Sequence, residues 1–155
     1  MEREEIRRLL YEKYIRPTEQ KKELYAGVEI EIPAVNLSGG ATDQDVTKQA
    51  FGDFTRAFGF QEQGRDQSGI CYSATDPVTG DNISFDCSYN NLEFSFAASK
   101  SLRPLAERFR TYITFLNDHL ASDDHLLTGM GINPHYHANR KDYLPVPRYQ
   151  MLEGY

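Results

Sequence analysis

The feature that most constrains the fold is an alternating segment at residues 27–34, GVEIEIPA. Side chains of an extended strand point alternately to opposite faces, so its branched apolar residues share one face while Glu29 and Glu31 share the other. Such a strand requires a sheet with one buried apolar face and one face on which two carboxylates stand side by side. The second face is either solvated surface or a site that uses concentrated negative charge.

Three β-rich runs between residues 69 and 99 indicate the rest of the sheet: GICYSATD, NISFDCSY and LEFSFAAS, separated by the turn sequences PVTGD and NN. This pattern predicts three antiparallel strands joined by two hairpins. Apolar residues recur at helical spacing from Val46 to Phe58 and from Leu105 to Leu120. The predicted fold class is α+β, an antiparallel sheet with helices packed on one face and the other face free for a ligand.

Punctuating residues predict where the elements begin and end. We expect a first helix over residues 2–15 that Pro17 ends, and a second helix that starts at Thr42 and stops at Gly59. Pro104 should occupy the first position of the third helix. A further strand is expected at 126–132, LLTGMGI, and a last helix from Pro147.

The second hairpin brings more acidic residues to the open face. A two-residue turn at 90–91 would pair Glu93 with Ser88 and would place Asp86 on the same face as Glu93. The apolar residues that alternate with them would then face the helices. If the strand at 27–34 joins this sheet, its two glutamates lie beside them.

Four carboxylates, those of Glu29, Glu31, Asp86 and Glu93, would thus converge on one sheet face. Like charges in proximity are destabilising unless they are protonated or bridged by a cation. Mg²⁺ takes oxygen ligands and is typically shared between a few carboxylates and substrate phosphates. These residues therefore predict a magnesium and nucleotide-phosphate site.

The alternative is that the acidic face is simply wet, as one face of an antiparallel sheet often is. Interleaved lysine or arginine would favour this alternative, yet GVEIEI, NISFDCSY and LEFSFAAS contain neither. Both interpretations remain open on the residues alone.

The length, net charge and composition of the chain argue against several classes of function. The 155 residues suit one domain, and the net charge of −6 without a basic stripe argues against nucleic acid as a partner. No apolar run approaches the ~20 residues of a membrane span, and the charged start MEREEIRRLL is unlike a secretory signal, which predicts a cytoplasmic protein. Cys71 and Cys87 lack redox or zinc spacing, so we expect reduced thiols, with a disulfide between neighbouring strands as the alternative.

Four segments, in order along the chain, resemble motifs of the glutamate–cysteine ligases of the plant and proteobacterial type. GVEIEI resembles the Gly-x-Glu-x-Glu strand that begins their catalytic sheet, and NNLEFSFAASKSL resembles their strand glutamate followed by small residues and a helix start. GMGINPH is similar to their Gly-x-Gly-x-x-Pro strand end, and LPVPRYQMLEGY to their arginine–tyrosine motif. The resemblance implies a glutamine synthetase-like ligase fold, whose antiparallel sheet forms a funnel.

The resemblance also implies an activity. Members of this family use ATP as a substrate to activate the γ-carboxylate of glutamate as an acyl phosphate, which the amine of cysteine then attacks, a step of glutathione biosynthesis. By resemblance Glu29, Glu31 and Glu93 would ligate Mg²⁺, whereas Asp86 is added from the hairpin geometry alone. Arg148 matches a position that holds the amino-acid substrate, which suits an arginine fork; the alternative is a surface arginine on a first helical turn. No catalytic residue is assigned.

The chain is much shorter than ligases of this type, so we expect residues 1–155 to be the N-terminal fragment of a longer catalytic domain, inactive alone. An incomplete sheet exposes an unpaired edge and apolar helix faces, which predicts self-association. Two alternatives stay open: a related carboxylate–amine ligase with another amine acceptor, and a non-catalytic domain that retains an acidic binding face.

Overall fold

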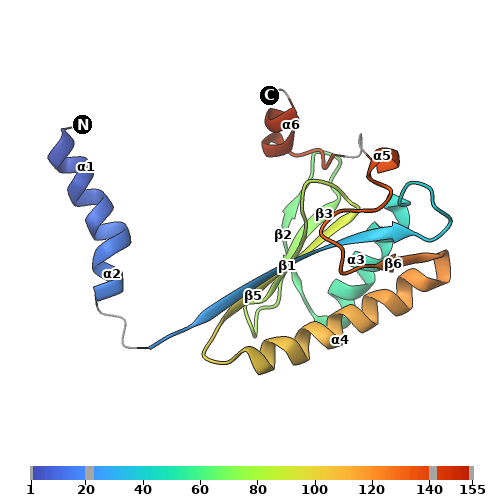
Figure 1. The fold of residues 1–155 in the computed structure, drawn as a ribbon, viewed down its shortest axis with the longest axis horizontal. Coiled ribbons are helices and arrows are strands. Elements are labelled where there is room, and N and C mark those ends of the chain that lie inside the picture. Colours follow the sequence, from blue (N-terminus) through green and yellow to red (C-terminus); the bar gives the residue numbers. More distant parts are fainter. Residues whose placement is uncertain (1, 20–22, 140–142, 154–155) are drawn as a thin grey trace.

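A computed structural model of the chain describes residues 2–19, 23–139 and 143–153. It is an α+β fold in which six strands form one antiparallel sheet in the order β2-β3-β4-β5-β1-β6 (Figure 1). The strands are β1 (Ala26–Asn36), β2 (Gln61–Arg65), β3 (Cys71–Thr75), β4 (Asn82–Phe85), β5 (Asn91–Ser99) and β6 (His125–Leu127). The helices are α1 (Arg3–Leu10), α2 (Arg16–Glu19), α3 (Gln44–Phe58), α4 (Leu102–Leu120), α5 (Tyr136–Asn139) and α6 (Pro147–Glu153).

One face of the sheet forms the core. The alternating apolar residues of β4 and β5 are buried there against α3 and α4, as their spacing predicts: Ile83, Phe85, Leu92, Phe94 and Phe96. Phe54 of α3 is fully buried, and its ring lies 5.2 Å from that of Tyr112 on α4 and 6.3 Å from that of Phe94. Because α3 and α4 take up this face, the polar face of the strands is left for a site.

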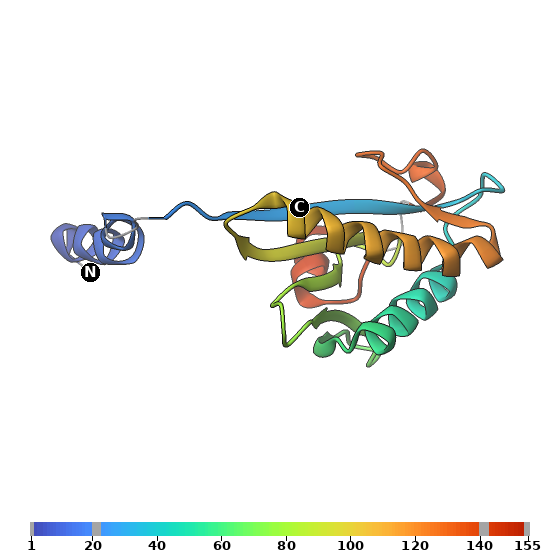
Figure 2. The ribbon, with the colours of Figure 1, turned by 90° about the horizontal axis from the view of Figure 1, so that it is seen from below.

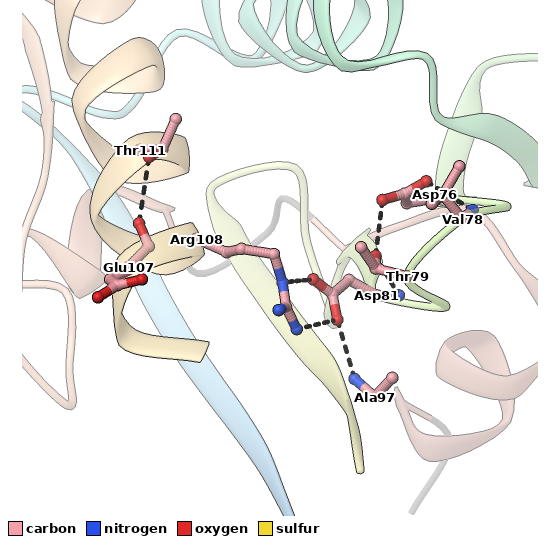
Figure 3. Close-up of polar contacts among 8 residues, drawn as sticks. All are labelled: Asp76, Val78, Thr79, Asp81, Ala97, Glu107, Arg108 and Thr111. Carbon is pink, nitrogen blue, oxygen red and sulfur yellow. Dashed lines mark hydrogen bonds and ion pairs between the residues drawn. The ribbon is translucent and has the colours of Figure 1, made fainter. Parts of the chain in front are cut away.

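A buried ion pair ties α4 to the sheet (Figure 3). Asp81, in the turn between β3 and β4, is 1% exposed and accepts two hydrogen bonds from the guanidinium of Arg108. The same carboxylate accepts a 3.0 Å hydrogen bond from the backbone N–H of Ala97 on β5. One side chain thus joins a turn, a strand and a helix.

The helix ends differ slightly from those predicted. Asp43, not Thr42, caps α3, since its carboxylate accepts from the N–H of Asp45 at 2.9 Å. Thr42 is buried instead and donates its hydroxyl to the carbonyl of Ala34 at 2.6 Å. Ser101 caps α4, so Pro104 sits inside the first turn rather than at its first position. Gly59 ends α3 with φ of 71°, as predicted.

Pro17 does not end the first helix, contrary to the prediction. A π-helical stretch at Tyr11–Ile15 separates α1 from α2, which runs through Pro17 to Glu19. The wider π turn shifts the hydrogen-bond register, so the proline's missing N–H and its ring are accommodated. The Thr18 hydroxyl donates to the carbonyl of Ile15 at 2.7 Å and completes this turn. Figures 1 and 2 both show α1 and α2 away from the sheet.

Two strands differ from the predicted pattern. The edge strand β2, sequence QEQGR, was not predicted because it has no apolar alternation. The last strand is only His125–Leu127, because Gly129 and Gly131 follow and the chain leaves the sheet there. Among the described residues, no helix is both long enough and apolar enough to cross a membrane.

Candidate metal-binding site

The polar face of the sheet holds a hollow of about 460 Å³ opposite the core. Acidic and hydroxyl side chains from β1, β3, β4 and β5 line it, and α6 closes one side. The lining side chains that carry charge or a phenol are Glu29, Glu31, Glu93, Asp86, Arg148, Tyr72 and Tyr149. All five site residues predicted from the sequence therefore lie around one hollow.

Strand pairing places two of the carboxylates directly opposite each other. Glu31 on β1 is the antiparallel partner of Glu93 on β5, and Ser84 on β4 is the partner of Glu93 on the other side. Side chains of directly opposite residues are neighbours on one face of a sheet. The hydroxyl of Ser95 donates to Glu93 Oε1 at 2.7 Å, which fixes one oxygen of this carboxylate.

The predicted pairing of Glu93 with Ser88 is wrong. Residues 86–90 form a five-residue connection between β4 and β5, whereas the sequence suggested a two-residue turn at 90–91. Cys87 has φ of 61° and an exposed side chain, so it belongs to this turn and not to the apolar face of a strand. The Asn90 carbonyl accepts from the N–H of Ala34 at 2.7 Å, so the turn packs against β1.

Asp86 nevertheless faces the same side as Glu93. Its backbone N–H donates to the carbonyl of Asn91 at 3.0 Å, which continues the β4–β5 ladder by one residue. The carbonyl of Cys87 then accepts from the N–H of Leu144 at 2.7 Å, which attaches the segment before α6 to the turn. Asp86 is therefore held between the strand end and the last helix.

Three of the four predicted carboxylates form a compact group. Glu31, Asp86 and Glu93 each offer an oxygen, and these three oxygens lie within 4.8 Å of one another. Glu29 lines the same hollow but lies outside the group, since it pairs with Ser95, one step further along β1. Two residues along a strand correspond to about 7 Å. The prediction that the carboxylates converge is therefore confirmed for Glu31, Asp86 and Glu93, whereas Glu29 lies too far along β1 to join them.

The charge of this group is not balanced by an ion pair. In the parts of the chain that the structure describes, no lysine or arginine forms a salt bridge with Glu31, Asp86 or Glu93. Arg148 lies on the wall of the hollow and is exposed. The arrangement leaves three carboxylates facing a polar space with one guanidinium at its side.

The donor set suits a small divalent cation. Mg²⁺ binds oxygen at about 2.1 Å in an octahedron, so opposite ligands of one ion are about 4.2 Å apart. Small side-chain rotations would bring the oxygens of Glu31, Asp86 and Glu93 from their present spread to this spacing. Ligands from three separate segments would leave further positions for water or phosphate oxygens.

Tyr149 is a site residue that the sequence analysis missed. Its side chain is buried, and its hydroxyl donates to Asp86 Oδ1 at 2.6 Å. Burial and this hydrogen bond to a carboxylate raise the pKa of Tyr149 to about 12, so the phenol stays a donor at neutral pH. The motif at the end of the chain assigns a role to Arg148 alone, and the acceptor of the Tyr149 hydroxyl becomes visible only in the fold.

Both cysteines carry free thiols. Cys87 lies on the turn beside the hollow, and desolvation by the neighbouring atoms together with the Asp86 carboxylate raises the pKa of its thiol. Cys71 on β3 is half-buried, and desolvation raises its pKa as well. Neither thiol is therefore activated at neutral pH.

Comparison of the chain with models of known protein families and with curated protein sequences gives no match.

Proposed function

We propose that Glu31, Asp86 and Glu93 bind Mg²⁺ and that this site serves an ATP-dependent carboxylate–amine ligase of the glutamate–cysteine ligase type, built on a glutamine synthetase-like fold. The observation that carries the proposal is the spread of at most 4.8 Å between three carboxylates that no described lysine or arginine neutralises. Carboxylates on a solvated surface gain no stability from lying this close together, because like charges repel. A cation bound between them would offset this repulsion.

The hollow also suits the substrates of this reaction. Bound Mg²⁺ would neutralise charge on the nucleotide phosphates. Ser73 and Ser84 offer hydroxyl donors on the floor of the hollow, and Arg148 at its wall suits the α-carboxylate of glutamate. Glu29 lies one step along β1, where it is placed to contact a water or a substrate amine rather than the ion.

In the proposed reaction the glutamate γ-carboxylate takes the terminal phosphoryl group of ATP, which releases ADP. The amine of cysteine then displaces phosphate from the acyl phosphate and loses a proton, which forms the amide. The chain contributes positioning and charge: carboxylates hold the ion, and Tyr149 orients Asp86.

Metal binding is the first test. Mn²⁺ replaces Mg²⁺ at oxygen sites and is followed by electron paramagnetic resonance. We expect Glu31→Gln and Glu93→Gln each to lower Mn²⁺ affinity by at least about tenfold, which is about 1.4 kcal/mol. Glu107→Gln, at an exposed carboxylate on α4, is the matched control and should leave affinity unchanged. Equal binding by all variants would remove the metal assignment.

Activity is tested on the complete reading frame of the gene by ADP release with glutamate present. Release that depends on cysteine and is lost in Glu93→Gln supports the ligase. Release with another amine instead of cysteine would identify the related ligase with a different acceptor. Metal binding without any ADP release would favour the non-catalytic alternative.

A further inference from the structure

One edge of β1 is open along the first part of the strand. β1 pairs with β5 over residues 26–33, but on its other side it pairs with β6 only through its last three residues. Residues 27–32 therefore have no neighbouring strand on that side among the described parts of the chain. An open edge of this kind presents unpaired backbone N–H and C=O groups to another extended chain.

Two hydrogen bonds show which backbone groups face the open side. The N–H of Ala34 donates at 2.7 Å to the carbonyl just before β5, whereas the carbonyl of Pro33 accepts at 3.0 Å from the N–H of Thr128, just after β6. Successive residues of a strand turn their backbone groups to opposite sides. The N–H and C=O groups of Glu29 and Glu31 therefore point to the open side, and no backbone group of the described residues bonds to them.

An apolar groove runs along the same edge, between β1 and α4. We call it the β1–α4 groove; its volume is about 220 Å³, and β1 and α4 run side by side along it (Figures 1 and 2). The lining residues come from β1, β5 and α4: Val28, Ile30, Phe96, Leu102, Leu105, Ala106 and Phe109. Leu102 is 59% exposed. The groove is open because no described strand covers this side of α4.

The opposite face of the same edge is acidic. Glu29 and Glu31 are exposed there and alternate along β1 with Val28 and Ile30, which line the groove. Residues directly opposite each other in paired strands share one face of the sheet. A chain paired with this edge would therefore meet apolar side chains on one face and two carboxylates on the other. An extended segment in which apolar residues alternate with lysine or arginine fits both faces.

The chain itself supplies no such segment. Of its 17 lysines and arginines, only Arg108 and Arg110 stand two positions apart, and both lie in α4. A second copy of β1 at this edge would place glutamates beside glutamates, which is destabilising. The occupant that fits is therefore a different polypeptide with basic residues at alternate positions.

We propose that the open edge of β1 binds an extended segment of a partner protein, alternately apolar and basic, as an added antiparallel strand. Its backbone pairs with that of Glu29 and Glu31, its apolar side chains enter the β1–α4 groove, and its basic side chains lie over the two carboxylates. Strand addition takes its affinity from backbone hydrogen bonds and its specificity from contacts with alternate side chains. The antiparallel direction continues that of the existing sheet. This binding does not depend on the metal site.

The first experiment uses the peptide Val-Lys-Val-Lys-Val-Lys, with blocked ends and a fluorophore, in fluorescence anisotropy with a metal chelator present. We expect saturable binding, and none for the analogue in which glutamate replaces lysine. Glu29→Lys and Ala106→Glu, both at exposed positions, should each weaken binding by at least about tenfold. Asp118→Lys and Thr111→Glu make the same charge changes elsewhere on α4 and should bind normally. No saturable binding, or equal binding by all variants, would overturn the proposal.

Backbone pairing is tested separately from charge. In an antiparallel pair, a residue directly opposite Glu29 or Glu31 turns its backbone groups toward β1 and its side chain to the acidic face. The lysines of the peptide take these positions, so N-methylation of the lysines should abolish binding and N-methylation of the valines should preserve it. Equal binding by the two methylated peptides would show that charge alone holds the peptide and would refute strand addition. Far-ultraviolet circular dichroism of each protein variant confirms folding.

Sedimentation equilibrium without peptide distinguishes a second copy from a different partner. We expect the unaltered chain and Ala106→Glu to have the same mass. A dimer that dissociates in Ala106→Glu would show that another copy of the chain occupies the edge, and it would refute the proposal.

Discussion

At the scale of single residues, the Tyr149 hydroxyl controls how well one carboxylate of the site is positioned. The bond to Asp86 Oδ1 is 2.6 Å long and half-buried, and it joins α6 to the end of β4. A carboxylate at the end of a strand can otherwise rotate toward solvent. Residues that orient metal ligands in this way commonly change affinity by 10–100-fold when they are altered.

Replacing Tyr149 tests that role. We expect Tyr149→Phe to lower Mn²⁺ affinity by about tenfold, because the Asp86 side chain loses the hydrogen bond that holds it and can rotate freely. Tyr136→Phe, at an exposed tyrosine, is the control.

The pKa of the Tyr149 phenol is raised above its ordinary value of 10, so the stability that this phenol contributes is present below pH 10 and is lost as pH rises toward 12. Urea unfolding at pH 9 to 12 should show a flatter decline in the phenylalanine variant; an unchanged slope would contradict this assignment.

Asp66 has the opposite dependence on pH. It is buried, which by itself raises a carboxyl pKa, but the Tyr89 hydroxyl and the backbone N–H groups of Ser68 and Ile70 donate to it and hold its pKa below the usual range. The stability from this group is therefore present above about pH 4, the unfolded value, and is lost as pH falls through the folded pKa. We expect Asp66→Asn to cost about 1–3 kcal/mol at pH 7.

The measurement for Asp66 is urea unfolding between pH 2 and 7. The stability of the unaltered chain and of Asp66→Asn should converge as the pH falls and the carboxylate of the unaltered chain takes up its proton. Asp118→Asn, at an exposed carboxylate on α4, should follow the unaltered chain throughout. A constant offset at every pH would mean that the loss is one of packing and not of charge.

At the scale of elements, Asp81 and Arg108 fix the position of α4 on the sheet. Removing Arg108 leaves a buried carboxylate without its counter-charge, so we expect Arg108→Ala to destabilise the fold by about 3–5 kcal/mol. Arg103→Ala removes an exposed partner of Glu107 on the same helix and should change stability little. The free energy of unfolding in urea measures both. Similar losses of unfolding free energy in the two variants would show that the buried ion pair contributes no more stability than the exposed one.

The pairing of β4 with β5 explains how much of the site the sequence could predict. The observed partner of Glu93 is Ser84 rather than Ser88, a shift of four residues. Side chains of a strand alternate with a period of two, so an even shift leaves the residues that do lie in the two strands on their predicted faces. Asp86 and Glu93 are thus on the predicted face although the predicted turn is too short. The turn conformation, with Cys87 at positive φ, depends on contacts with β1 and Leu144 that are distant in sequence.

Other elements lacked a local signal. The edge strand β2 is polar, so no alternation marks it, and its pairing with β3 decides its conformation. The π-helical stretch arises from a hydrogen-bond shift that composition does not encode. By contrast, the apolar residues at helical spacing in α3 and α4 and the glycine in the left-handed conformation at position 59 are local features, and they were predicted correctly.

At the scale of the whole molecule, the sheet separates two kinds of chemistry. Aromatic side chains from α3, α4, β4 and β5 fill one face, and carboxylates from β1, β5 and the connection that follows β4 gather on the other. The core holds the strands rigid, so the acids cannot move apart to relieve their repulsion except through side-chain rotation. The cation that we propose would therefore meet carboxylates that rigid strands already hold close together.

The length of β1 has a consequence for how this strand can change. Its portion 26–33 pairs with β5, with a register shift between Ala26 and Val28, and carries both glutamates, while its last three residues pair with β6. Deleting one residue near Pro33 would turn one of these two portions over, so that either the glutamates enter the hydrophobic core or the attachment to β6 fails. The strand can therefore accept substitutions, but an insertion or deletion of a single residue near Pro33 would turn the side chains of one portion to the opposite face of the sheet.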